Sequence, residues 1–303
     1  MICRSRAVAA VLGVALCLLG GLAATAPAQA APGLAVATGI PPLGYLLERL
    51  AGGPATVQVL VGPGQNYHTY ELTPRQRTAL SQCQAYFKLG LPFERTLLGK
   101  LGGSHPGMKV VDLTQGLDLA PAPNEGHHPG EEEHNEGELD LHLWLSPRLA
   151  QGMARAMART LEELDPADIA GYRQRLEALL TDLRRVDQRL EQVLAPYRGG
   201  SFLVYHPAFG YLGRDYGLKQ VAVEIGGKEP GARHLAGIIQ KAQEQGIKVV
   251  FVQPQFPQKS AQQVASQIGG AAVIMDDLAP DYLANLERLA AGLEQGLKGQ
   301  KRP

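Results

Sequence analysis

Four residues of this sequence have side chains suited to binding a metal ion, namely His68, His142, His206 and Asp276. Each of them follows a predicted strand or lies at the end of a loop, and open α/β sheets bind their ligands beyond the carboxyl ends of the strands. Three neutral imidazoles and one carboxylate make a tetrahedral ligand set that suits Zn²⁺. The residue types therefore favour a zinc site.

The positions of these residues along the chain are less decisive, because the four lie far apart, unlike the paired cysteines of a zinc finger. A histidine near the end of a strand is more often a hydrogen-bonded core or capping residue. Asp276 and its neighbour Asp277 also lie near the start of the last predicted helix. From these residues alone, a metal site and a set of structural polar groups both remain open.

A charged segment directly before His142 favours the metal site. Residues 121–139 contain six glutamates and three histidines, His127, His128 and His134, with almost no apolar side chain. Such a segment cannot offset the entropy cost of ordering, so we predict a flexible loop. Histidines and carboxylates on a flexible chain can bind metal weakly, which predicts a secondary, zinc-collecting role. A solvated acidic linker is the alternative.

The first thirty residues have the composition of a signal peptide. Arg4 and Arg6 precede an apolar run over Val8–Ala24, and residues 28–30 form a cleavage motif of the A-x-A type. A membrane anchor is the alternative, but the apolar run is short and interrupted by glycines. We therefore predict that residues 1–30 are a cleaved signal peptide and that the mature protein is exported to the periplasm.

The composition argues against several other classes of protein. The 303 residues include 29 Lys and Arg against 29 Asp and Glu, which leaves no basic field for nucleic acid or an anionic membrane. Aromatic residues make up 6% of the chain, too few for a base-stacking surface. Signal-peptide cleavage would leave Cys83 as the single cysteine, which predicts a buried structural thiol and no internal disulfide.

Predicted strands alternate with predicted helices along the rest of the chain, the pattern of a largely parallel sheet flanked by helices. Residues 31–163 form one predicted lobe and residues 199–303 a second lobe of the same α/β class. Between them, residues 164–198 have apolar side chains at steps of three and four, which predicts one long helix joining the lobes.

Local motifs predict where several elements begin. Thr73 and Gln76 form a capping box for a helix that starts at Pro74, and Ser146 is the predicted N-cap of a helix from Pro147 to about Leu164. The apolar run over Val221–Ile225 predicts a strand.

Six segments resemble the periplasmic zinc-binding solute-binding proteins of ABC importers, the ZnuA-like receptors of metal-binding cluster A-I. The most specific match is Asp140–Pro147, which is close to the family pattern D-x-H-x-W-L-S-P. The other matching segments are Gly64–Leu72, Tyr205–Tyr211, Arg233–Leu235, Phe251–Phe256 and Met275–Leu278. The resemblance covers essentially all of the mature chain.

This resemblance implies a receptor that performs no chemistry on its cargo. It implies that Zn²⁺ lies between two lobes, with His68 and His142 from the first lobe and His206 and Asp276 from the second. It also implies a membrane permease of an ABC importer as partner, and a monomeric receptor. His206 lies where manganese-binding relatives tend to have a carboxylate, and three nitrogen ligands favour zinc over the harder Mn²⁺.

The chain departs from the family pattern at three positions near the expected site. Tyr67 replaces a common proline before the first ligand, Asp277 replaces the proline after Asp276, and Gln253 replaces a common glutamate. Asp276, Asp277 and a water molecule therefore all remain candidates for the fourth ligand. His234 matches a structural helix position of the family and is not predicted to be a ligand.

Two other functions share these features. An exported zinc hydrolase would use three histidines and a reactive water, but the sequence has no HExxH motif and no glutamate placed to act as general base. A periplasmic zinc buffer or chaperone would have the same site and differ only in its partner.

Overall fold

A computed structural model describes residues 33–53, 55–101, 107–122, 139–224, 230–298 and 300. These residues belong to one compact unit that begins at Gly33. The predicted signal peptide lies outside the described residues, as do the loop histidines His127, His128 and His134.

The first half of the chain builds a four-stranded sheet in the order β2-β1-β3-β4, with every neighbouring pair parallel. Helices connect these strands, as parallel pairing requires. In chain order the elements are β1 (Ala35–Thr38), α1 (Pro41–Ala51), β2 (Thr56–Val59), α2 (Pro74–Leu80), β3 (Ala85–Lys88), α3 (Pro92–Leu101) and β4 (Lys109–Asp112).

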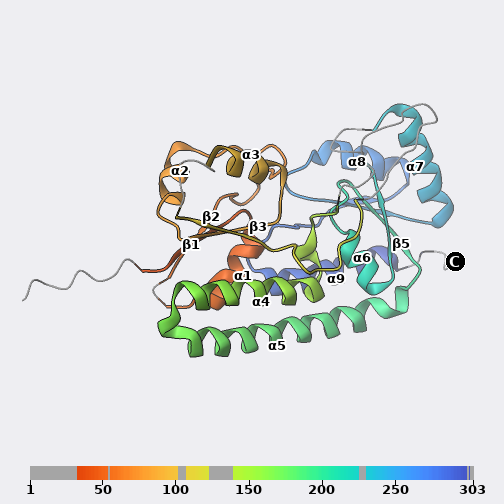
Figure 1. The fold of residues 1–303 in the computed structure, drawn as a ribbon. Helices are drawn as coiled ribbons and strands as arrows, with labels where there is room; N and C mark the ends of the chain where they lie inside the picture. The colour runs from red at the N-terminus through yellow and green to blue at the C-terminus, as the bar shows by residue number, and fades with distance from the viewer. Residues whose placement is uncertain are drawn as a thin grey trace, which may run out of the picture. The chain divides into compact units, whose positions relative to one another are not determined.

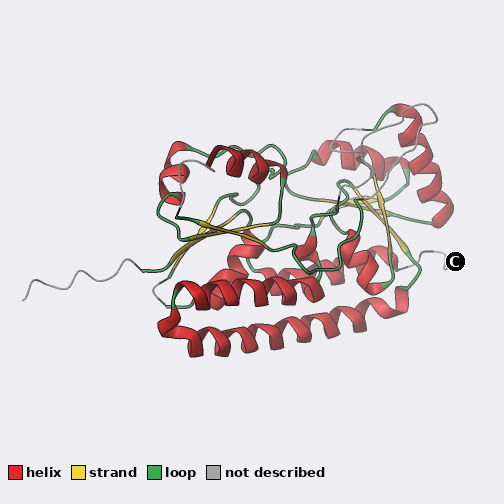
Figure 2. Cartoon of the chain, viewed as in Figure 1, coloured by secondary structure: helices red, strands yellow, loops and turns green. Residues whose placement is uncertain are grey.

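The second half builds another four-stranded parallel sheet, in the order β6-β5-β7-β8. Its elements are β5 (Ser201–Val204), α6 (Gly210–Tyr216), β6 (Lys219–Ala222), α7 (Ala232–Gln245), β7 (Val249–Val252), α8 (Gln258–Gln267), β8 (Ala271–Ile274) and α9 (Tyr282–Leu297). Two parallel sheets flanked by helices confirm the predicted α/β fold class (Figure 2).

Two long helices lie between the sheets in the sequence, α4 (Pro147–Leu164) and α5 (Ile169–Leu194). They run side by side, and α5 also contacts α1 and α9 (Figure 1). Short 3₁₀ turns, η2 (Pro166–Asp168) and η3 (Ala195–Tyr197), flank α5, and both contain a proline, which cannot supply the N–H that the interior of a helix needs. The predicted long helix is confirmed, while the predicted lobe boundaries stay predictions.

The apolar core has two parts, which divide at the second sheet. Side chains of β5 alternate between its faces, so that Phe202 and Val204 join the large cluster with α5 and α9, and Leu203 faces the other way. Leu203 belongs to a smaller cluster that includes Ile238 of α7 and Val264 of α8. The second sheet is therefore covered on both faces, as its apolar strands require.

Most local predictions are confirmed. The Thr73 hydroxyl accepts a hydrogen bond from the Gln76 N–H, and the Ser146 hydroxyl accepts one from the Leu149 N–H. Cys83 is buried, and burial raises the pKa of its thiol to about 11.

The predicted strand over Val221–Ile225 was wrong in its position. Strand β6 covers Lys219–Ala222, because Lys219 pairs with Ser201 at the start of β5. Lys219 and Gln220 lie on an edge strand, where polar side chains can reach solvent. The apolar run from Val221 therefore did not indicate that the strand begins at Lys219.

Candidate metal centre

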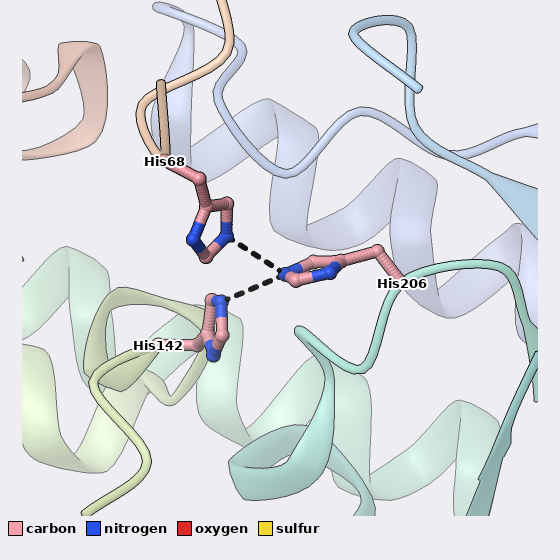
Figure 3. Close-up of side chains that lie close together, drawn as sticks. All are labelled: His68, His142 and His206. Carbon is pink, nitrogen blue, oxygen red and sulfur yellow. Dashed lines mark hydrogen bonds between the residues drawn. The ribbon is translucent and has the colours of Figure 1, made fainter. Parts of the chain in front are cut away.

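Three of the four predicted ligands meet at one point in the structure. His68 lies in the loop after β2, His142 directly before the 3₁₀ turn η1 (Leu143–Leu145), and His206 two residues after β5. Nε2 of His206 lies 3.1 Å from Nε2 of His68 and 3.4 Å from Nε2 of His142 (Figure 3). Among the described residues, these three form the one group of ligating side chains whose atoms all lie within 4.8 Å of one another.

The ring of His142 is fixed by Asp140 in the same short motif. Oδ1 of Asp140 accepts hydrogen bonds from the backbone N–H of His142 at 2.9 Å and from its Nδ1 at 2.6 Å. Asp140 is itself buried, and Trp144 two residues further on is completely buried. Asp140 therefore orients the ring and selects its tautomer: in the neutral imidazole Nδ1 carries the hydrogen, and the Nε2 lone pair is on the side of the other histidines.

The ring of His206 is fixed in the same way by Glu224, which follows β6. Oε2 of Glu224 accepts from Nδ1 of His206 at 2.7 Å, and both side chains are buried. Phe256 stacks on the imidazole with ring centroids 4.5 Å apart, and the Gln253 side chain donates to the His206 carbonyl. The Nε2 lone pair of His206 therefore also faces the centre of the group.

His68 is held less firmly. Its backbone N–H donates to Oδ1 of Asn66 at 2.8 Å, which closes the turn that delivers the ring. The imidazole packs against that of His206 with centroids 4.7 Å apart. Among the described residues, no carboxylate accepts a hydrogen bond from the His68 ring.

Burial favours the uncharged, metal-binding form of two of the three histidines. Burial, followed by the neighbouring histidines, lowers the pKa of His68 to about 3 and places the pKa of His206 well below its usual value. Burial also raises the pKa of Glu224 to about 7. Imidazoles must be neutral to act as ligands, so near neutral pH His68 and His206 need lose no proton to bind an ion.

The facing lone pairs indicate what the group can do. With the hydrogens of both rings on Nδ1, next to Asp140 and Glu224, the Nε2 atoms of neutral His142 and His206 are two acceptors 3.4 Å apart. Two acceptors at that distance repel each other, and a cation between them removes the repulsion. The donor set therefore fits Zn²⁺, whose preferred ligands include neutral imidazole.

The fourth predicted ligand, Asp276, is not part of this group. Its Oδ1 accepts from the backbone N–H of Leu278 at 2.8 Å, and it lines a cavity of about 290 Å³ beside Asn285 and Arg288 of α9. Its neighbour Asp277 is linked to the histidines through Tyr67, whose hydroxyl oxygen lies 3.3 Å from Oδ2 of Asp277 and 2.9 Å from Nε2 of His142.

Sequence reasoning missed three residues that shape the site. Glu224 had no recognisable motif. Asp140 was visible within the D-x-H pattern, but its role in fixing the ring was not predicted. Tyr67 was noted as a departure from the family pattern without a role. His234, which was not predicted to be a ligand, lies in the first turn of α7 and outside the histidine group.

The ends of the predicted acidic loop meet in the structure. Pro121 and Leu139 form an antiparallel bridge, and the Asp140 N–H donates to the Ala120 carbonyl at 3.0 Å. The Tyr211 hydroxyl of α6 donates to the Asp140 carbonyl at 2.8 Å. The base of the loop is therefore fixed two residues from His142.

Within the described part of the chain, no helix is long and apolar enough to cross a membrane. Most of the described chain matches a single family model. The family is described as "Zinc-uptake complex component A periplasmic", and the match covers residues 36–296.

Two curated relatives carry the description "High-affinity zinc uptake system protein ZnuA". The protein from Yersinia pestis is 29% identical over 252 residues, which cover 73% of this chain and 76% of the relative. The protein from Bacillus subtilis is 27% identical over 256 residues, which cover 81% of this chain and 78% of the relative.

Solved structures agree with these sequence matches. A crystal structure of ZnuA superposes with a TM-score of 0.80 at 36% identity and covers 88% of this chain and 100% of its own. A zinc-bound ZnuA deletion mutant gives a TM-score of 0.81 at 36% identity, with 89% of this chain and 100% of its own covered.

Proposed function

Because this chain belongs to the ZnuA family of periplasmic zinc-uptake components, we propose that His68, His142 and His206 bind Zn²⁺ as the cargo of a transport system. The protein is a zinc-binding receptor for high-affinity zinc uptake, and the members of its family are solute-binding proteins and not enzymes. Zinc is therefore bound and released, with no bond made or broken in a substrate.

One observation carries the assignment of the ligands. Three histidines from separate segments of the chain direct their Nε2 atoms at one another, and carboxylates hold the Nδ1 hydrogens of two of them. Carboxylate–histidine pairs of this kind orient the imidazoles of zinc sites. Three nitrogen ligands also favour Zn²⁺ over Mn²⁺.

The experiment is metal analysis of protein purified without added metal, followed by competition titration against a chromophoric zinc chelator. The wild-type protein is expected to bind one zinc ion tightly. His142→Ala and His206→Ala are expected to lose tight binding while keeping the far-UV circular dichroism of the wild type. Unchanged affinity in both variants would refute the assignment.

Asp276 remains the sequence-based proposal for the fourth ligand. To reach an ion at the histidines, its carboxylate would have to leave the Leu278 N–H. Asp276→Ala tests this directly. If Asp276 is a ligand, its removal should lower zinc affinity to an extent comparable with the histidine variants.

The partner of the receptor is the membrane permease of an ABC importer, to which it delivers zinc as a monomer. The family's place in zinc uptake supports this part of the proposal. We also propose that residues 1–30 are a signal peptide that is cleaved on export, in keeping with a periplasmic family. Zinc-dependent binding to the purified permease separates a receptor from a zinc buffer, and amino-terminal sequencing of the exported protein tests cleavage.

A further inference from the structure

The Tyr67 side chain lies against the histidine group, although it was not among the predicted ligands. It is completely buried, and its hydroxyl oxygen lies 2.9 Å from Nε2 of His142. The same hydroxyl lies 3.3 Å from Oδ2 of Asp277. Tyr67 therefore bridges an imidazole in the first half of the chain and a carboxylate that follows β8.

Asp277 is held in place from several sides. Its Oδ1 accepts from the Gln255 side chain at 2.6 Å, and its backbone carbonyl accepts from the indole N–H of Trp144 at 2.7 Å. Tyr282 in turn donates to the Trp144 carbonyl. These contacts fix Asp277 as the one of the two adjacent aspartates that faces Tyr67.

The Tyr67 hydroxyl has one hydrogen to donate and two neighbouring groups that can accept it. Asp140 holds the Nδ1 hydrogen of His142, so Nε2 of that ring is an acceptor, and Asp277 offers the other. With the site empty, the hydroxyl can donate to Nε2 and cover its lone pair. Once that lone pair is engaged by zinc, Asp277 is the remaining acceptor, and an oxygen lone pair of Tyr67 faces the ion.

We propose that the Tyr67 hydroxyl, oriented by Asp277, is the fourth ligand of an ion bound by the three histidines. This inference rests on the proposed zinc-binding function and specifies the site further. Tyr67 would give the ion a neutral oxygen beside three neutral nitrogens, with the Asp277 carboxylate one hydrogen bond away. Asp277 is a positioning residue in this arrangement, and Asp276 has no part in it.

The test compares four variants by zinc competition titration and by the visible spectrum of the protein loaded with Co²⁺. Tyr67→Phe removes only the hydroxyl and is expected to lower zinc affinity about tenfold, the effect of one well-placed polar contact. It should also change the Co²⁺ spectrum, which reports the atoms bound to the metal. Asp277→Asn should give a smaller loss of affinity, and Asp276→Asn should match the wild type in both measurements.

Tyr86→Phe is the matched control. Tyr86 is also completely buried, and its hydroxyl donates to the buried carboxylate of Glu94 at 2.9 Å, so this variant removes an equivalent hydroxyl from a different pair. It should destabilise the fold to a similar extent and leave zinc affinity and the Co²⁺ spectrum unchanged.

Two results would overturn the inference. One is a Tyr67→Phe protein whose affinity and Co²⁺ spectrum equal those of the Tyr86→Phe control. The other is a loss of affinity with a changed spectrum in Asp276→Asn. Failure of the proposed function would look different. Either the wild-type protein would bind no zinc tightly, or His206→Ala would bind zinc as tightly as the wild type.

Discussion

The two sheets have the same strand order but supply the metal centre in different ways. In each sheet the first strand lies between the second and the third, with the fourth at one edge. The second half supplies His206, which is 4% exposed and fixed by Glu224 close to the strand ends. The loop after β2 supplies His68, whose N–H donates to Asn66 and whose ring has no carboxylate acceptor among the described residues.

This difference separates a fixed part of the site from an adaptable one. The rings of His142 and His206 are oriented by buried carboxylates before any ion arrives, so little ordering entropy is lost when they bind. His68 completes the site from a loop. A repeated fold thus does not imply a repeated chemical role, and the comparison can be tested by substitutions on each side.

The largest effect is expected from His206→Ala, which removes the fixed ligand of the second half. Zinc affinity should fall by more than about a hundredfold, beyond the usual cost of losing a residue that only supports a ligand. His68→Ala should lower zinc affinity less, since the two fixed ligands, His142 and His206, would remain. Competition titration measures both, and an equal or larger loss in His68→Ala would contradict the distinction between fixed and adaptable ligands.

A smaller effect is expected from the groups that hold the ligands. Glu224→Gln keeps the size of the side chain but weakens the hydrogen bond to Nδ1 of His206, and zinc affinity should fall about tenfold. The control is Asn66→Ala, which removes the side-chain acceptor of the His68 N–H and should change affinity less. If Asn66→Ala lowers zinc affinity more than Glu224→Gln does, His68 is held more firmly than His206, and the comparison is reversed.

Zinc should also stabilise the two halves together, because its ligands come from both. At a free concentration 100 times Kd, a ligand of the native state adds about 2.7 kcal/mol to the free energy of unfolding. For a chain of this size that corresponds to a rise in Tm of roughly 5–10 °C.

Two probes show whether the halves respond as one. Trp144 is the single tryptophan of the chain and lies beside His142, with ring centroids 5.3 Å apart, whereas far-UV circular dichroism reports all helices. Both transitions should shift by the same amount with zinc and return with a chelator. A shift in fluorescence alone would mean that the halves unfold separately.

Much of the fold could be predicted because its determinants are local. The capping box at Thr73, the Ser146 cap and the periodicity of α5 each depend on residues within a few positions of one another. The convergence of His68, His142 and His206 was expected from the resemblance to zinc receptors, whereas their positions beyond strand ends left a metal site and structural polar groups both open.

The parts that could not be predicted depend on packing between distant segments. Tyr67 and Asp277 are 210 positions apart, and no pattern in either segment marks them as partners. Asp277 lies beside Tyr67 because Trp144 and Gln255 hold it there, and nothing in the sequence around Asp276 and Asp277 indicates these contacts. Such contacts exist only once both halves are folded.

The smallest effect on the tight site is expected from deleting residues 123–138, which carry the proposed weak zinc sites at His127, His128 and His134. The bridge between Pro121 and Leu139 already brings the ends of this segment together, so a short linker can replace it without moving His142. Calorimetric titration should show the tight site unchanged and the additional weak binding lost, because the loop predicted here would have to be ordered to hold an ion and so would bind less tightly than a preformed site. Replacing the three loop histidines with alanine in the full-length protein is the control and should remove the same weak binding. If the tight site disappears with the segment, or the weak binding survives both changes, then the loop does not collect zinc separately from the three-histidine site.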